Sequence, residues 1–213
     1  MRIPVSRRGF IELASAASAA LIALARGWVA VPHAGALTRW RLLAPITGQI
    51  GSCSFHCGAC GGSTSNPCDN ALDFMYRLGP NDTKVKLYIL NDSGVSGYGG
   101  ILSLETTCSS ALNPDHKRMK YNVATSGFVL LGVGVISHIV PSVAVGALVS
   151  ANGGQLGTMH PNTDQFKTGC YEGTHVHFGV LSGAGYPTTM TPIGSWSNVN
   201  VTAGFNAPWE KYI

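Results

Sequence analysis

Alternating apolar and other positions recur along most of the chain and predict β-strands. The clearest case is 83–90, where Val85, Leu87 and Ile89 alternate before an Asn-Asp-Ser-Gly turn at 91–94. Further strands are expected at 70–76, 100–107, 121–140, 143–157 and 174–180. After the N-terminal region we find no helical periodicity, internal repeat or interdomain linker. The pattern predicts an all-β fold, a single domain with a mainly antiparallel sheet and a groove.

The first 36 residues depart from this pattern. An arginine pair at 7–8 precedes an apolar run from Ala14 to Ala25, and small residues follow at 34–36. The run is shorter than the ~20 residues that a membrane helix needs. This favours a twin-arginine (Tat-type) export signal at 1–36 over a membrane anchor or a buried helix. We therefore expect a mature domain at 37–213 that is periplasmic or secreted and not held in a membrane after cleavage.

Removing the leader changes the charge of the chain. Residues 1–36 carry four of the 14 basic side chains and one of the ten acidic ones, which leaves ten basic and nine acidic groups, a net charge of +1. The high isoelectric point therefore belongs mostly to the leader. No basic cluster with interleaved aromatic residues remains, so nucleic acid is not an expected partner.

Six cysteines fit an exported protein. In an oxidising compartment an even number is typical of disulfides, and six cysteines allow 15 pairings. Four of them crowd into one loop, at Cys53, Cys57, Cys60 and Cys68. We expect these four to be mainly disulfide-bonded, with metal binding by the same thiols as the rival interpretation.

The most informative local pattern is Thr174-His175-Val176-His177-Phe178-Gly179-Val180, an apolar, strand-like run with histidines two residues apart. Side chains alternate across a strand, so His175 and His177 face the same way, about 6–7 Å apart. This spacing suits two imidazoles with separate roles at one site. Asp73 lies between Leu72 and Phe74 in another apolar strand, and a buried carboxylate there must be paired or bound to a metal.

Several segments together resemble the lysostaphin/β-lytic family of zinc metalloendopeptidases. They are Ala44–Ile50, a histidine (His56) followed by a long loop and Ala71–Phe74, the segment from Ile136 to Gly157 that carries His138, and the His-x-His strand. They extend from residue 44 to 180 in the family's order. Two departures stand out. The position four before Asp73, a histidine in many members, is Asp69 here, and Gly179 stands where an acidic residue is common.

The resemblance implies a function and a site. His56, Asp73 and His177 would be the metal ligands of one Zn²⁺ per chain, and a catalytic zinc site typically has three protein ligands and one open position. His175 would act as the general base and acid, and His138 would stabilise the oxyanion, although these two roles could be exchanged. The implied substrate is a peptide of bacterial cell-wall peptidoglycan, cut by a monomeric hydrolase.

Two other functions stay open at this stage. One is a wall-binding or regulatory domain of the same fold without catalysis, suggested by the absence of a short-spaced first histidine. The other is an exported redox protein with cysteine ligands, suggested by the cysteine-rich loop and the Tat-type leader. Of the remaining histidines, His116 lies in a charged Asp-His-Lys-Arg stretch and is expected to be solvated, and His160 is expected to be a loop residue.

Overall fold

In a computed structural model, the described residues are 37–51, 55–56, 68–75, 83–106, 115–161, 174–182 and 190–213. The predicted export signal and five of the six cysteines lie outside these ranges. Residues Thr38–Ile213 form one compact unit. Every regular element that the structure describes is a β-strand, and no described helix is long and apolar enough to cross a membrane.

The strands are mostly short. Those before residue 125 are β1 (Arg39–Leu42), β2 (Gly48–Ile50), β3 (Leu72–Met75), β4 (Lys84–Asn91), β5 (Tyr98–Thr106) and β6 (Lys117–Ala124). Those after it are β7 (Leu130–Pro141), β8 (Leu148–Ser150), β9 (Asn152–Met159), β10 (His175–Val180), β11 (Thr191–Pro192), β12 (Asn200–Val201) and β13 (Trp209–Tyr212).

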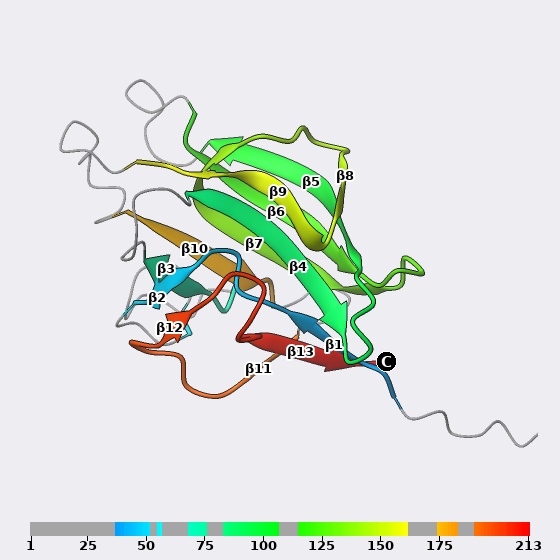
Figure 1. Ribbon diagram of the computed structural model, residues 1–213. Helices are drawn as coiled ribbons and strands as arrows, with labels where there is room; N and C mark the ends of the chain where they lie inside the picture. Colours follow the sequence, from blue (N-terminus) through cyan, green and yellow to red (C-terminus); the bar gives the residue numbers. More distant parts are fainter. Residues whose placement is uncertain are drawn as a thin grey trace, which may run out of the picture. The chain divides into compact units, whose positions relative to one another are not determined.

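All described strand pairs are antiparallel and belong to one sheet. Its main path runs β11-β13-β1-β4-β9-β7-β10-β3-β2-β12, and β6, β5 and β8 extend from β7 (Figure 1). β10 thus lies between β3 and β7, which brings together chain segments about 100 residues apart. The predicted all-β, mainly antiparallel fold is confirmed.

The long strand β7 changes partner along one edge. Its first part pairs with β10, ending at the Ser137–His177 pair, and its last part pairs with β9, beginning at the Ile139–Met159 pair. His138 lies at this fork with a positive φ of 62°. The register against β6 also shifts here, between Lys117 and Met119. Such a bulge re-aims a side chain, and a non-glycine residue in this conformation is uncommon enough to suggest a functional constraint.

The alternating pattern read from the sequence builds the core. Val85, Leu87 and Ile89 of β4 are fully buried, as are Phe74 of β3 and Phe178 of β10, whose rings meet edge to face with centroids 5.7 Å apart. β10 is buried along its whole length. Its histidines are therefore held in a rigid, largely water-excluded part of the sheet.

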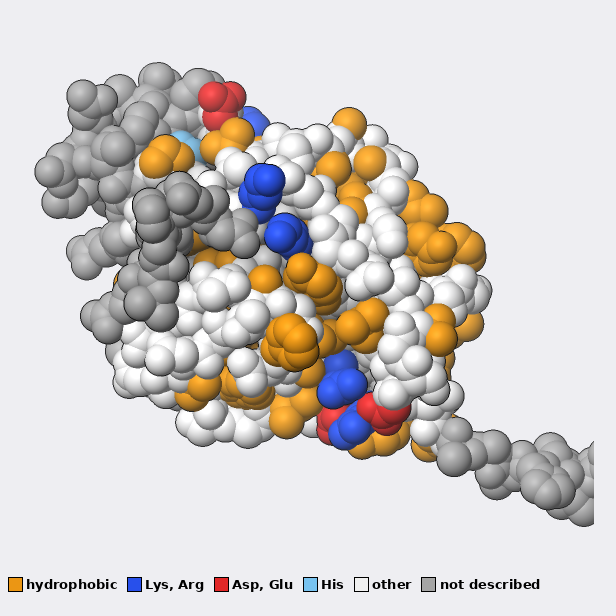
Figure 2. Space-filling view, viewed as in Figure 1, with side chains coloured by type: hydrophobic (Ala, Val, Ile, Leu, Met, Phe, Trp, Pro, Cys, Tyr) orange, Lys and Arg blue, Asp and Glu red, His pale blue; other side chains and the backbone are white. Residues whose placement is uncertain are grey.

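The C-terminal segment joins the sheet instead of lying across it. β13 pairs with β1, and Trp209 is completely buried against Phe55 and Phe178. Phe205 is exposed, although its carbonyl accepts a hydrogen bond from the Ala44 amide. Figure 2 shows one face of the molecule, on which charged side chains are few and lie in small groups, with acidic and basic side chains side by side at its lower edge.

Candidate metal centre

Two of the predicted ligands face each other across neighbouring strands. The register of β10 against β3 pairs His177 with Asp73 directly, and His175 with Met75. Nδ1 of His177 lies 3.0 Å from Oδ1 of Asp73. The i, i+2 spacing puts His175 on the same side, with its Nε2 3.8 Å from the same oxygen. The strand ladder fixes this arrangement, because slipping by one residue would turn every side chain to the other face.

The third predicted ligand reaches the same place from a separate segment. His56 forms an isolated antiparallel bridge with Ala71, in which each backbone amide donates to the other residue's carbonyl, at 3.0 and 2.8 Å. This bridge sets His56 beside β3, and its Nε2 lies 3.5 Å from Oδ1 of Asp73. The 17-residue separation of His56 from Asp73 in the sequence is therefore compatible with one shared site.

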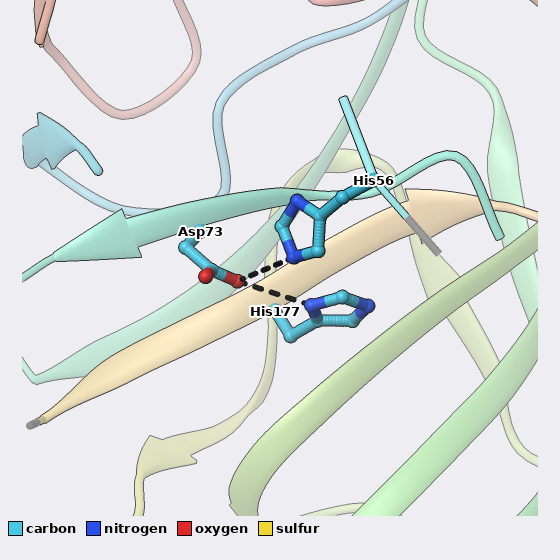
Figure 3. Close-up of side chains that lie close together, drawn as sticks. All are labelled: His56, Asp73 and His177. Carbon is cyan, nitrogen blue, oxygen red and sulfur yellow. Dashed lines mark hydrogen bonds and ion pairs between the residues drawn. The ribbon is translucent and has the colours of Figure 1, made fainter. Parts of the chain in front are cut away.

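The donor atoms of His56, Asp73 and His177 all lie within 4.8 Å of one another and could hold a metal ion (Figure 3). Ligand atoms at zinc-like bond lengths of about 2.0–2.1 Å in a tetrahedron are roughly 3.3 Å apart. The two separations from Asp73 Oδ1, 3.0 and 3.5 Å, bracket that value. Two imidazoles and a carboxylate are also the donor set of many catalytic zinc sites, so the residues present fit this ion.

A second pair of imidazoles flanks the cluster. The ring of His138 lies with its centroid 4.6 Å from that of His175 and 6.3 Å from that of His177. Burial, together with the nearby His175 and His116, lowers the pKa of His138 to about 2. At neutral pH this side chain is therefore an uncharged imidazole. It can donate one hydrogen bond and accept another.

The charges inside the cluster are strongly coupled. Burial alone would lower the pKa of His177, but its hydrogen bonds to Asp69 and Asp73 and their negative charges outweigh burial and raise it to about 9. Burial would raise the pKa of Asp73, but hydrogen bonds from His177 and His56 hold it well below its usual range. A positive charge is thus already favoured at this point. When no metal is bound, the protonated imidazole of His177 carries it.

Sequence reasoning missed one residue of the centre. The side chain of Asp69 is only 8% exposed. Its Oδ2 lies 2.9 Å from Nε2 of His177, the ring nitrogen opposite to the one that faces Asp73. Nη2 of Arg118, on β6, lies 3.5 Å from the same oxygen. The signal was present in the sequence, since Asp69 occupies the position where a histidine is common in the resembling family.

Two further histidines are buried near the centre, and the prediction that His116 is solvated is wrong. His116 is completely buried, and its Nε2 lies 2.9 Å from Nδ1 of His138. His160 follows β9 in a loop, as expected, but it is also buried, with its ring centroid 5.0 Å from that of His116. Six histidines of the described chain therefore form one continuous group: His56, His116, His138, His160, His175 and His177.

The cysteine prediction can be followed at one residue. Cys68 is disulfide-bonded, and its partner lies outside the described residues. Its carbonyl accepts hydrogen bonds from the amide and the hydroxyl of Ser182, at 2.5 and 2.7 Å. Cys68 thus fixes the chain directly before Asp69. The predicted grouping of Cys53, Cys57 and Cys60 with it stays a prediction.

No protein-family model, curated protein or solved structure matches the chain. The interpretation of the site therefore rests on its own geometry.

Proposed function

We propose that the protein is a zinc-dependent endopeptidase that hydrolyses peptide bonds in bacterial cell-wall peptidoglycan. One observation carries the proposal: three donors suited to a metal and two further imidazoles, His138 and His175, converge from four separated segments of the chain. A purely structural ion pair would need neither the second pair of imidazoles nor the strained backbone of His138.

A zinc ion held by His56, Asp73 and His177 would activate a water molecule and polarise the scissile carbonyl as a Lewis acid. In this division of the site, the other two imidazoles would carry out proton transfer and hydrogen bonding. The rings of His138 and His175 contact each other, and the ring of His138 also lies near that of the ligand His177.

The proposal assigns the proton transfer to His175. Its Nε2 is close to Asp73, and the side chain is largely buried. A neutral imidazole there accepts the proton of the attacking water and passes it to the leaving amine. His138, held neutral by burial, donates a hydrogen bond to the oxygen that gains charge in the transition state.

The expected compartment agrees with such a substrate. The twin-arginine pattern at 7–8 predicts export, and the disulfide at Cys68 is typical of proteins that work outside the reducing cytosol. We accordingly propose a periplasmic or secreted monomer whose partner is the peptide part of the wall.

The test combines metal content with hydrolysis. Purified protein should contain close to one zinc per chain and release new amino groups from purified peptidoglycan, and chelation should stop the release until zinc is restored. Asp73→Asn should abolish both properties, whereas the matched control Asp92→Asn, in an exposed ion pair with Arg39, should change neither. Zinc binding without hydrolysis would favour the non-catalytic wall-binding alternative, and Asp73→Asn with full zinc content would contradict the site.

A further inference from the structure

We propose that Asp69 is a positioning residue that fixes the ring orientation and tautomer of His177, so that Nδ1 of His177 is its metal-binding atom. The inference rests on the proposed function only for the identity of the metal. In many members of the family that the chain resembles, a histidine ligand stands at the position of Asp69. Here we assign Asp69 the positioning of His177 instead of metal binding.

The geometry separates the two ring nitrogens of His177. Nε2 is 2.9 Å from Oδ2 of Asp69, and Nδ1 is 3.0 Å from Oδ1 of Asp73. An ionised carboxylate can only accept, so the imidazole donates its Nε2 hydrogen to Asp69. A neutral imidazole with its hydrogen on Nε2 has a free lone pair on Nδ1. That atom is the one beside the other two donors.

The same geometry argues against Asp69 as a fourth ligand of the same ion. The two nitrogens of one imidazole point to opposite sides of the ring, so an ion at Nδ1 is turned away from the carboxylate at Nε2. The compact donor group accordingly contains His56 and Asp73 with His177, and Asp69 lies outside it. Carboxylates that accept from the far nitrogen of a ligating histidine are a common way to orient it and to raise its basicity.

Asp69 is held for this contact from three directions. Its carbonyl accepts a hydrogen bond of 2.6 Å from the amide of Val180. The carbonyl of the preceding residue, Cys68, accepts hydrogen bonds from Ser182. Arg118 supplies the opposite charge at 3.5 Å. Within the described residues the other oxygen, Oδ1, is buried without a hydrogen-bond partner. Desolvating a carboxylate in this way is costly unless the remaining interactions compensate. The contact with His177 supplies this compensation.

Gly179 makes the approach possible. A Cβ added at 179 would overlap the carbonyl oxygen of Asp69 and would lie 2.8 Å from the Cβ of Ala71. Residue 179 therefore has to be glycine for the Asp69 segment to lie this close to β10. The two departures from the family pattern, at 69 and 179, are thus explained by a single local arrangement.

The test measures zinc alone, without a wall substrate. Asp69→Asn keeps the size and an acceptor oxygen but removes the charge, and Asp69→Ala removes both. Zinc affinity should fall about 10–100-fold in Asp69→Ala and by less in Asp69→Asn, with Asp92→Asn as the matched control. Cobalt-substituted protein should keep its visible band positions in Asp69→Asn, because the ligands themselves are unchanged. Nitrogen-15 NMR of the zinc-bound protein should show the His177 hydrogen on Nε2.

The outcomes separate this inference from the proposed function. Equal zinc affinity in wild type and Asp69→Asn, a hydrogen on Nδ1, or a changed cobalt spectrum would overturn the positioning role while leaving hydrolysis intact. Failure of the wild type to hydrolyse peptidoglycan, with the predicted zinc affinities observed, would overturn only the proposed function. A wild-type protein that binds no zinc would overturn both.

Discussion

Nε2 of His116 and Nδ1 of His138 lie 2.9 Å apart, which links an imidazole just before β6 to one at the fork of β7. With His116 as the donor, neutral His138 carries its own hydrogen on Nε2. With this tautomer of His116, the buried pair would set Nε2 as the nitrogen of His138 that can donate to a substrate oxygen.

The first prediction concerns this pair. His116→Phe should lower kcat for peptidoglycan hydrolysis at least about tenfold, because His138 loses the partner that fixes its tautomer, and zinc content should stay near one. His116→Gln, whose amide nitrogen can take the place of Nε2, should recover part of the rate. Equal activity of both variants and the wild type would show that the contact is structural.

The second prediction separates a ligand from a proton carrier on one strand. His177→Ala should lose zinc and activity together. His175→Ala should retain most of the zinc and lose about 10²–10⁴-fold in rate, the usual range for general acid–base help. Metal analysis and a rate assay on the same samples check this, and a fully active His175→Ala variant would remove His175 from the mechanism.

The third prediction concerns pH. As the pH rises, the stability of the metal-free protein should fall and its affinity for zinc should rise. The pKa of His177 is raised from 6.5 to about 9, so its proton stabilises the metal-free fold below pH 6.5, and this stabilisation is lost as the pH rises through 9. Zinc must displace that proton, so zinc affinity should rise by up to about tenfold per pH unit between 7 and 9.

Thermal unfolding of the metal-free protein and zinc titrations across this pH range provide the measurements. His177→Gln should flatten the stability profile. A zinc affinity that does not change with pH, with no proton released on binding, would mean that His177 is not a ligand.

The fourth prediction uses the backbone of His138, whose φ is 62°. Asn tolerates the left-handed region and β-branched residues do not. His138→Val should therefore be less stable than His138→Asn by about 1–2 kcal/mol, as measured by urea unfolding. Both variants should lose hydrolysis and keep zinc. Equal stability of the two would indicate that the fork relaxes without cost.

The fifth prediction tests the close approach at Gly179. Gly179→Ala should destabilise the protein by about 1–3 kcal/mol, since the overlapping atoms are mainly backbone and cannot turn away. Gly100→Ala is a matched control on β5, where an added Cβ meets nothing nearer than 3.9 Å. Equal losses in both variants would mean that strand propensity, not the contact with Asp69, determines the effect.

The strands and the shared face of His175 and His177 could be predicted from the sequence. Side chains alternate along any strand with a period of two residues, whichever strands it pairs with. The sequence was insufficient for His116. Met119, Tyr121 and Val123 alternate inward along β6, but the register shift between Lys117 and Met119 interrupts this alternation, and the buried position becomes 116. A bulge depends on the partner strand, so charged neighbours in the sequence gave a misleading indication of solvent.

Asp69 was missed for a related reason. Its role depends on which nitrogen of His177 it meets. That follows from the hydrogen bonds that the carbonyls of Cys68 and Asp69 accept from Ser182 and Val180, about 110 residues away. Spacing in the sequence identifies residues that lie on one strand. It does not identify a side chain brought in by a bridge outside the regular strands.

The unequal anchoring of the three donors has a kinetic consequence. Asp73 and His177 belong to paired strands, whereas His56 is attached through a two-bond bridge to Ala71. We expect metal capture to begin at the strand pair and to finish when His56 closes, and release to follow the reverse order. The residence time of the ion would then depend on His56 and its bridge, whereas the rate of first encounter would depend on the two strands.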